Sequence, residues 1–563
     1  MSPETKSCQN CRQEFVIEPD DFSFYNRIGV PAATQCPDCR RQRRLAWRND
    51  YNFYNRECGL CGRKIISIYS PEKLVPIYCN KCWWSDGWDP GQYGRDYDPS
   101  RPFFEQYREL LDTVPALAIL NDNNIASVGC EYTNYFALGK NCYLTMNSWK
   151  VENCMYCYHM VNAKDMVDVM TVFSNARNIY ESIYVGESNS CRFIFNSESL
   201  IDCAFCYDCK DCTDCFMSIG LRHKKYCVKN EQYSKEEYGK IVAGYRLDTW
   251  SGSERAKKEF FGFILKFPRR PANFMNCVNC TGNYLVNSKN ALNCWNAVRV
   301  EDSKFFENGD TIKDSYDCAS GGEQELCYEG INPDNSYGTH FTSYCHKDRN
   351  VLYADSCQSS EELFGCVGLK SAKYCILNKQ YDKGSYEKLK AEIIENMKKR
   401  GEWGEFFPVP LSTFGYNETL AQDSYPLTKD EALAKGYRWQ DKLQFTTGKE
   451  TMREIPDAIS DVPDSIVDEI LACMECGRNY KVIAEELAFY KKNGIPVPRR
   501  CFFCRLKDRL KLKNPVKLWH RSCMCDKQNH NHSSSCQNGF ETSYAPERPE
   551  IVYCESCYNA EVG

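Results

Sequence analysis

Cysteines in close pairs are the residues of this chain whose type and spacing could do chemistry. The 563 residues include 37 cysteines, and many of these stand in CxxC pairs. That spacing suits a tetrahedral metal site and is too tight for an ordinary structural disulfide. Four thiolates suit Zn²⁺ and leave no open coordination position for catalysis. We therefore predict zinc as the cofactor, four structural ions per chain, with iron–sulfur clusters as the less favoured alternative.

The same double cysteine module occurs at both ends of the chain. In each copy 25 residues separate the first two pairs, the next cysteine follows 19 residues later, and the sixth cysteine precedes the last pair by 18 residues. The C-terminal copy differs by ten residues inserted within its third pair. The predicted metal ligands are Cys8, Cys11, Cys36, Cys39; Cys58, Cys61, Cys79, Cys82; Cys473, Cys476, Cys501, Cys504; and Cys523, Cys536, Cys554, Cys557.

The insert carries metal-binding side chains that the N-terminal copy lacks. Cys525, His530 and His532 could ligate a further metal or substitute into the fourth set. No fourth ligand for a separate site is evident in the sequence. An exposed loop is therefore the favoured interpretation.

A second unusual run lies in the middle of the chain, where cysteines follow one another at intervals of three. That spacing could wrap a metal ion or a cluster. The alternative is a tight corner of a repeat with stacked thiols, whose neighbouring aspartates would hinder thiolate formation. The residues are Cys203, Cys206, Cys209, Cys212 and Cys215.

Basic residues follow the second cysteine pair of the first and third sets. Residues 36–48 carry five arginines against one aspartate, whereas residues 301–330 carry nine acidic side chains against two lysines. Charges on a metal-held helix could follow a phosphate backbone, so nucleic acid is the predicted partner. The alternatives are a solvated face and a face that docks on the acidic middle of this or another chain. The predicted nucleic-acid-binding residues are Arg40, Arg41, Arg43, Arg44, Arg48, Arg505, Lys507, Arg509, Lys511 and Lys513.

Both basic segments read as helices, residues 39–49 and 504–514, that begin at a ligand cysteine. With the first cysteine pair, Phe15 or Tyr480, and the FY dipeptides at 24–25 and 489–490, each module resembles the probable zinc-ribbon family of small bacterial treble-clef-like domains. The whole chain is similar to large cysteine-rich proteins of candidate-phyla bacteria that flank a repeat region with such modules. This resemblance implies a fold for the ends and carries no activity.

Between the modules, a small polar residue followed by cysteine or an apolar residue recurs with a period of 12, as in Asn153-Cys154, Asp165-Met166 and Asp202-Cys203. The period predicts a β-solenoid in which each repeat adds a short strand and a polar turn. Residues 225–240 recur at 373–388, and each copy runs into a charged segment that we expect to be a capping helix.

The predicted fold is therefore multi-domain and mainly β, with duplicated double zinc modules around two cysteine-rich β-solenoid-like regions with helical caps. The expected divisions are 1–90, first double module; 91–120, aromatic connector; 121–232, first repeat region; 233–272, helical cap and linker; 273–380, second repeat region; 381–470, helical cap and proline-rich connector; and 471–563, second double module with its insert.

Several function classes are excluded or weakened. The start, MSPETKSCQNC, has no apolar signal-peptide segment and no stretch reads as a membrane span, so we expect reduced thiols and a cytoplasmic location. No P-loop, GxGxxG, GxSxG or HExxH motif occurs. A non-catalytic zinc protein that binds nucleic acid is predicted. A scaffold for protein partners is the alternative, and an enzyme using the solenoid groove is the third reading.

Trp83, Trp84 and Trp88 form a cluster after the first double module. They could offer a stacking platform for bases or sugars. Packing against a neighbouring domain is the more common role of such a cluster, and we favour it.

Overall fold

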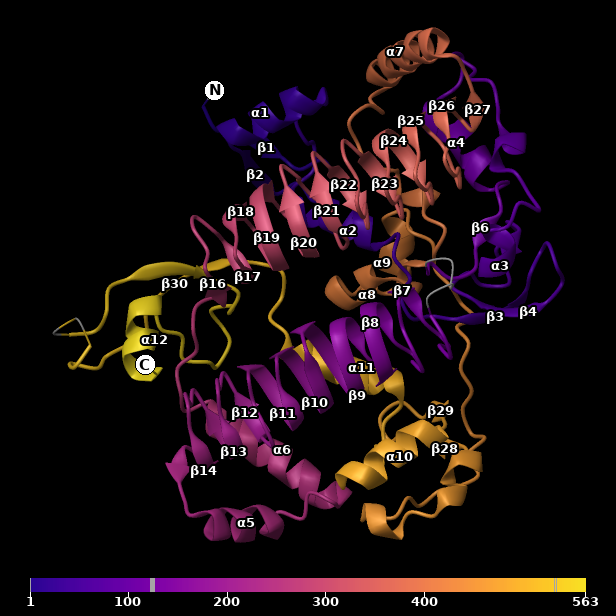
Figure 1. The fold of residues 1–563 in the computed structure, drawn as a ribbon. Helices are drawn as coiled ribbons and strands as arrows, with labels where there is room; N and C mark the ends of the chain where they lie inside the picture. Colours follow the sequence, from indigo (N-terminus) through magenta and orange to yellow (C-terminus); the bar gives the residue numbers. More distant parts are fainter. Residues whose placement is uncertain (1, 122–126, 531, 533, 563) are drawn as a thin grey trace.

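A computed structural model describes residues 2–121, 127–530, 532 and 534–562. The described chain is mainly β-sheet. The first repeat region forms a nine-stranded sheet and the second forms two six-stranded sheets. Figure 1 shows these sheets as two facing stacks, with segments from both ends of the chain packed against them.

The strands of the first repeat region are β7 (Asn134–Ala137), β8 (Met146–Met155), β9 (Tyr158–Ser174), β10 (Ala176–Gly186), β11 (Asn189–Glu198), β12 (Ala204–Tyr207), β13 (Thr213–Ile219), β14 (Lys225–Val228) and β15 (Glu231–Gln232). Those of the second are β16 (Phe274–Met275), β17 (Gly282–Val286), β18 (Lys289–Leu292), β19 (Cys294–Lys304), β20 (Glu307–Lys313), β21 (Gly322–Glu325), β22 (Tyr328–Ile331), β23 (His340–Ser343), β24 (Arg349–Asp355), β25 (Glu361–Phe364), β26 (Lys373–Ile376) and β27 (Lys379–Gln380).

The ends of the chain contribute β1 (Glu4–Ser7), β2 (Glu14–Ile17), β3 (Tyr54–Glu57), β4 (Lys64–Ser67), β5 (Ile77–Tyr78), β6 (Ala116–Leu117), β28 (Leu471–Ala472), β29 (Asn479–Tyr480), β30 (Trp519–Ser522) and β31 (Gly539–Thr542). The helices are α1 (Pro19–Ile28), α2 (Pro37–Leu45), α3 (Asn80–Trp83), α4 (Phe103–Leu111), α5 (Lys235–Gly244), α6 (Trp250–Ile264), α7 (Lys383–Arg400), α8 (Leu420–Ser424), α9 (Lys429–Ala434), α10 (Ala484–Asn493), α11 (Phe502–Leu512) and α12 (Glu555–Val562).

The sequence period of 12 equals the register of the parallel sheets, in which residues 12 apart lie on neighbouring strands and pair with each other. Cys154 pairs with Met166, and Ile179 pairs with Cys191, each a step of 12. Met166 pairs with Ile179 across the single step of 13. All four side chains are buried in one apolar cluster. Cysteine, methionine and isoleucine are therefore interchangeable here because the position needs an apolar side chain and has no need of a ligand.

The chain turns at every third residue of the repeat regions. Asp202, Phe205, Asp208, Asp211 and Asp214 all have φ between 47° and 56°, the left-handed conformation. Asparagine and aspartate tolerate this conformation better than other non-glycine residues. The residue that precedes an inward-facing cysteine, often asparagine or aspartate, therefore marks a corner of the backbone.

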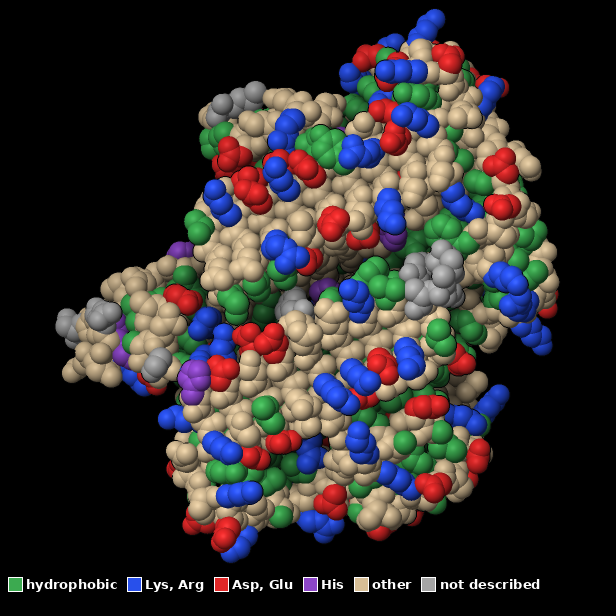
Figure 2. Space-filling model, viewed as in Figure 1, with side chains coloured by type: hydrophobic (Ala, Val, Ile, Leu, Met, Phe, Trp, Pro, Cys, Tyr) green, Lys and Arg blue, Asp and Glu red, His purple; other side chains and the backbone are tan. Residues whose placement is uncertain are grey.

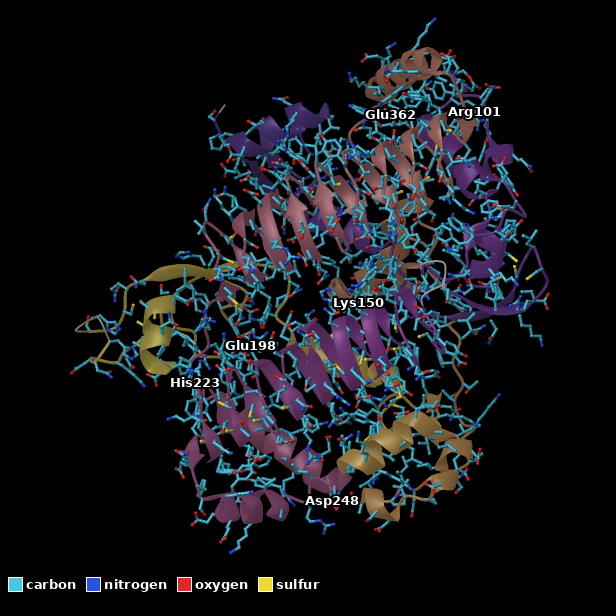
Figure 3. All side chains as sticks on the ribbon, in the orientation of Figure 1. Arg101, Lys150, Glu198, His223, Asp248 and Glu362 are labelled. Carbon is cyan, nitrogen blue, oxygen red and sulfur yellow. The ribbon has the colours of Figure 1, made fainter. Side chains whose placement is uncertain are left out.

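Outward-facing charges form ladders along the sheets with the same step. Lys210 pairs with Glu198 at 3.4 Å, and His223 lies 3.6 Å from Asp211. In Figure 3, Glu198 and His223 lie at one edge of the first sheet. Exposed ion pairs of this kind each contribute little to the free energy of unfolding. Their main effects are on solubility and strand register.

Helices follow the last strands of both repeat regions, as the repeated segment predicted. In each region the last two strands are antiparallel, β14 with β15 and β26 with β27, and they lead into α5 and α7. A short helix, α9, follows Thr428, and its capping box joins Thr428 to Glu431. Among the described residues, none of the helices is both long and apolar enough to cross a bilayer.

One buried carboxyl group in the second repeat region gives a testable pH dependence. Burial raises the pKa of Asp348 to about 7, whereas an unfolded aspartate titrates near pH 4. Between about pH 4 and pH 7 the folded state therefore binds more protons than the unfolded state. The free energy of unfolding falls as pH rises through this range, because the buried carboxyl group must then lose its proton.

We expect Asp348→Asn to raise the unfolding temperature more at pH 8 than at pH 5.5, measured by scanning calorimetry. The amide stays neutral at both pH values, so the variant escapes the cost of the buried charge. Asp302→Asn, at an exposed position, is the control. A gain for Asp348→Asn that is the same at both pH values would contradict this account.

Candidate metal centres

The structure brings together all four predicted cysteine sets. Within each set the four Sγ atoms lie within 4.8 Å of one another. Three inter-pair contacts are shorter, 3.8 Å for Cys11–Cys36, 3.7 Å for Cys476–Cys501 and 3.9 Å for Cys536–Cys554. A Zn–S bond of about 2.3 Å places the sulfurs of a tetrahedron about 3.8 Å apart, so these sets have the dimensions of a zinc site.

Each set is built from the same two local elements. The first pair connects the strands of a two-stranded antiparallel sheet, β1–β2, β3–β4, β28–β29 or β30–β31. The second pair stands at the start of a helix, α2, α3, α11 or α12. A helix N-terminus presents free N–H groups and a partial positive charge, which together stabilise thiolates.

Backbone N–H groups prepare individual thiols for metal binding. The N–H groups of Cys36, Cys79 and Cys554 donate to the Sγ atoms of Cys8, Cys58 and Cys523 at 3.2, 3.3 and 3.1 Å. Burial alone would raise the pKa of Cys8, but backbone donors outweigh it and lower the pKa to about 6. The pKa of Cys58 is lowered to about 6 in the same way. Such thiols are ready to give up their protons to a metal near neutral pH.

The cysteine run from 203 to 215 is not gathered into a metal-sized group with other ligands anywhere in the described part of the chain. Each cysteine follows a left-handed corner and points into the core of the first repeat region. Cys203 Sγ donates to the carbonyls of Ile201 and Cys212 at 3.3 and 3.6 Å. Contacts with neighbouring thiols, together with burial, raise the pKa of Cys206 well above its usual value. Protonated thiols that satisfy backbone carbonyls explain this run.

The arginines predicted to contact nucleic acid are mostly buried in ion pairs, so in this structure few of them face solvent. Arg40, Arg43, Arg44, Arg48, Arg505 and Arg509 are all buried. Arg41 contacts Glu307 at 2.8 Å, Arg43 contacts Glu329 at 2.9 Å, and Arg48 contacts Asp50 at 2.8 Å. Of the other four predicted residues, Lys507 and Lys511 are exposed, and Arg41 and Lys513 are half-buried.

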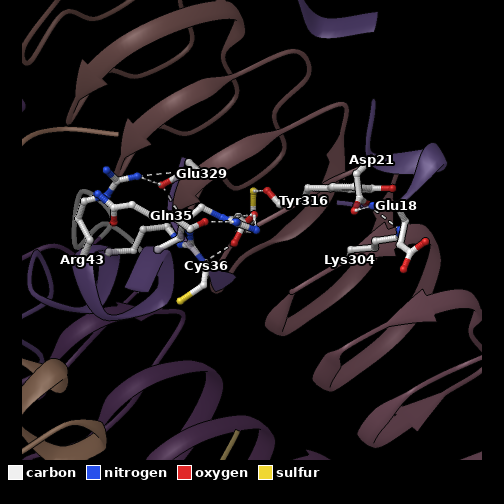
Figure 4. A network of polar contacts seen from close by, with 12 residues as sticks. Glu18, Asp21, Gln35, Cys36, Arg43, Lys304, Tyr316 and Glu329 are labelled. Atoms are coloured by element: carbon white, nitrogen blue, oxygen red, sulfur yellow. Dashed lines mark hydrogen bonds and ion pairs between the residues drawn. The ribbon is translucent and has the colours of Figure 1, made fainter. Parts of the chain in front are cut away.

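The acidic middle of the chain supplies most partners of the N-terminal arginines. Figure 4 shows Arg43 of α2 beside Glu329 and, further along the sheet, Asp21 of α1 beside Lys304. The Lys304–Asp21 ion pair measures 2.6 Å, and both side chains are buried. The alternative in which the basic segment docks on the acidic middle of the same chain is therefore the arrangement observed.

Two arginines of α2 hold one buried aspartate of the second repeat region. Arg40 and Arg44 lie 2.8 and 3.0 Å from the carboxylate of Asp317, which is 0% exposed. Burial opposes the charge of Arg40, but Asp317 more than offsets this and the pKa of Arg40 is raised. We call Arg40, Arg44 and Asp317 the N-terminal clasp.

The same arrangement recurs in the other half of the molecule. Arg505 and Arg509 of α11 lie 2.9 and 2.8 Å from the carboxylate of Asp168, also 0% exposed, without the alignment of a hydrogen bond. Cys39 and Cys504 are equivalent, so Arg505 and Arg509 match Arg40 and Arg44. We call Arg505, Arg509 and Asp168 the C-terminal clasp.

Aromatic contacts beside the clasps repeat as well. Arg40 lies 5.3 Å from the ring centre of Phe305, and Arg505 lies 4.6 Å from that of Tyr156. Tyr25 contacts Tyr328 edge-on at 5.6 Å, and their counterparts Tyr490 and Tyr180 do so at 5.9 Å. Helix α2 of the N-terminal module thus docks on the second repeat region, and α11 of the C-terminal module docks on the first.

The tryptophan cluster packs against the second repeat region. Trp83 is 0% exposed, and Trp84 and Trp88 lie 4.8 and 5.9 Å from it, ring centre to ring centre. Lys370 Nζ lies 4.3 Å from the Trp83 ring, and burial lowers the pKa of Lys370 to about 8. The rings enclose a side chain of this protein, in agreement with the packing interpretation.

The insert forms a fifth group of potential ligands. Sγ of Cys525, one ring nitrogen each of His530 and His532, and Sγ of Cys557 lie within 4.8 Å of one another. Cys557 is the fourth ligand that the sequence did not reveal, because it already belongs to the fourth set. The aspartates of the two clasps were also missed, since nothing in their local sequence distinguishes them from other corner aspartates.

On the face shown in Figure 2, the described residues form no large patch of a single charge sign. On the face seen in Figure 2, Lys and Arg side chains alternate with Asp and Glu over both sheets. The formal net charge of −5 is small for a chain of this length. The arginines of the two helices are mostly paired inside the molecule, whereas Lys507 and Lys511 remain exposed.

Comparison with known proteins assigns no family. No family model and no curated protein matches the chain. A solved structure from Desulfovibrio desulfuricans G20, provisionally named an acetyltransferase, is 11% identical, with a TM-score of 0.09. That match covers 42% of this chain and 64% of the other protein, and it bears on neither fold nor activity.

Proposed function

We propose that this chain is an intracellular, non-catalytic zinc protein in which the end modules fasten two repeat regions into one scaffold. The cysteine sets have the size, ligand type and closed arrangement of structural zinc sites. In this proposal the modules are zinc-ribbon or treble-clef-like domains and the repeat regions are β-solenoids. Reduced, hydrogen-bonded thiols throughout the core support an intracellular location.

The observation that carries the proposal is the crossed docking of the two modules. The ligand helices α2 and α11 each send an arginine pair to a buried aspartate in the repeat region that is more distant in sequence, so zinc binding and assembly of the sheets are linked. Arg40 and Asp317 are 277 residues apart. Because the basic helices bind within the chain, the outer faces of the sheets remain as the surfaces that protein partners could contact. Repeat scaffolds bind their partners through such extended surfaces.

Nucleic-acid binding through the same helices is the weaker proposal. Lys507 and Lys511 are the two of its ten residues that stand exposed, and they adjoin the acidic Asp508. Affinity for mixed RNA or DNA should therefore show little salt dependence, because few phosphates can be neutralised. A steep fall of affinity with salt that depends on Lys507 and Lys511 would restore this reading.

Metal analysis of the purified chain tests the zinc assignment. We expect zinc as the bound metal, with one equivalent lost in each of Cys36→Ser, Cys79→Ser and Cys501→Ser. Cys212→Ala, which removes a buried cysteine of the repeat core, should lose none. Iron in place of zinc, or equal metal loss in the core variant, would overturn the assignment.

A further inference from the structure

The C-terminal module places two potential metal tetrads side by side. One is the cysteine set that has an N-terminal counterpart, and the other is made by the insert. Cys557 belongs to both groups, and in each of them the ligand atoms lie within 4.8 Å of one another. Two ions in these tetrads would therefore share one thiolate.

The contacts inside the second tetrad have metal-site dimensions. Cys557 Sγ lies 3.4 Å from Nε2 of His532, and Cys525 Sγ lies 3.0 Å from Nδ1 of His530. Zn–S and Zn–N bonds of about 2.3 and 2.0 Å separate sulfur from nitrogen by about 3.5 Å in a tetrahedron. An ion would need to widen one contact slightly and would leave the other almost unchanged.

Burial supports a ligand role for these side chains. Cys525 is 0% exposed, and the His530 side chain is 2% exposed. Cys525 packs in a buried cluster with Tyr553 and Tyr558, and the His530 ring lies 6.3 Å from that of Tyr553. Nε2 of His530 is buried there without a hydrogen bond, which is costly for a polar ring nitrogen. Coordination would satisfy both groups at once.

The outer ring nitrogens are placed as zinc-binding histidines require. Nε2 of His530 lies 3.5 Å from the Glu561 carboxylate, which Lys527 also contacts at 2.5 Å. Nδ1 of His532 contacts the carbonyl oxygen of Ser534. Metal-bound histidines almost always donate their second ring N–H to a carboxylate or a carbonyl, which fixes the tautomer. Each histidine therefore has one nitrogen turned to the shared centre. The other nitrogen of His532 meets a carbonyl, and that of His530 lies near a carboxylate without yet forming a hydrogen bond.

Charge also favours two ions over one. A zinc ion with four thiolates carries a net charge of −2, and Cys525 beside it would add a further negative charge on ionisation. Five thiolates with two zinc ions leave a net charge of −1. A bridging thiolate thus lowers the electrostatic cost of gathering these sulfurs in a partly buried site.

We propose that the C-terminal module holds a binuclear zinc centre bridged by the Cys557 thiolate. Cys523, Cys536 and Cys554 complete the first ion, and Cys525, His530 and His532 complete the second. The proposal deepens the proposed zinc function and rests on the four-cysteine sites. The N-terminal copy has no equivalent of the insert, so Cys82, the counterpart of Cys557, serves a single ion there.

Metal content separates this proposal from the function on which it rests. We expect five zinc ions in the full-length chain and four in the His530→Ala/His532→Ala variant. His520→Ala, which removes an exposed histidine outside the group, should keep five. Deletion of residues 525–534 leaves Cys523 and Cys536 in a CxxC pair like that of Cys58 and Cys61, so this variant should fold and bind four ions.

Cadmium NMR reads the bridge directly. With ¹¹³Cd in place of zinc, two of the cadmium resonances of the full chain should be coupled to each other through the shared sulfur. The deletion variant should lose this coupling and one resonance. Four ions in every protein, or a fifth ion that survives loss of both histidines, would overturn the binuclear centre and leave the four-cysteine sites standing. Absence of zinc from the full chain would overturn the proposed function itself.

Discussion

Removal of zinc should unfold both end modules and detach them from the repeat regions. Each structural zinc ion contributes on the order of 10 kcal/mol to folding in small zinc domains. The helices that carry the clasps, α2 and α11, begin next to the ligands Cys36 and Cys501. Without metal the N-termini of these helices are no longer held in place. The arginine pairs are then no longer positioned to contact Asp317 and Asp168.

Hydrogen exchange before and after chelation measures this effect. We expect α2, α11 and the short sheets β1–β2 and β28–β29 to lose protection, while the parallel sheets keep theirs. The parallel sheets keep their own register and their own apolar clusters, so they do not need the metal to stay paired. Addition of zinc should restore protection of the modules, and protection that persists in metal-free protein would show that the modules fold without ions.

Neutralising the aspartate of one clasp should be the most damaging single substitution away from the metal ligands. Asp317→Asn leaves Arg40 and Arg44 buried with weakened partners, although Glu329 still lies 3.4 Å from Arg44. Removing one partner of a buried ion pair typically costs about 3–5 kcal/mol because the remaining charge stays desolvated. The urea midpoint should fall accordingly, and exchange in α2 should quicken.

Two controls separate the clasp from general surface charge. Asp314→Asn removes a carboxylate that pairs with the exposed Arg27, and such pairs contribute about 0–1 kcal/mol. Asp168→Asn should loosen α11 and leave α2 protected, because the two clasps lie in different halves of the molecule. If Asp317→Asn costs no more than Asp314→Asn, the clasp does not hold the module.

A third variant tests whether the clasp supplies stability or specificity. Replacing Arg40, Arg44 and Asp317 together by methionine, methionine and leucine removes the charges along with their desolvation cost. Buried ion pairs replaced by apolar residues often leave stability unchanged or improved. The triple variant should therefore be more stable than Asp317→Asn alone.

The local elements could be read from the sequence because short-range chemistry fixes them. A CxxC pair offers two thiols to one ion wherever it lies, and the matching spacings of the two copies identify which pairs belong together. The period of 12 was readable because a left-handed corner favours asparagine or aspartate and the next residue must face inward. Met166 and Ile179 at cysteine positions already indicated that this column packs and does not bind metal.

The partners of the arginines could not be read in the same way. Five arginines after a cysteine pair look the same in sequence whether phosphates or carboxylates neutralise them. The acidic stretch at 301–330 pointed to the correct region, but the choice of Asp317 and Glu329 depends on which corners of the sheet face α2. Charge pairing acts through space, so its outcome follows from the docking of distant segments.

The paired cysteines thus determined by themselves where the ligand sets lie and which residues form them, because each set is built from two short local motifs. Tertiary structure alone decided that the two modules cross over to opposite repeat regions and that Cys557 stands between two tetrads. Both facts depend on contacts between segments that are far apart in the sequence, and the sequence alone does not show that they meet. A shared thiolate and a buried clasp exist only once the chain has folded back on itself.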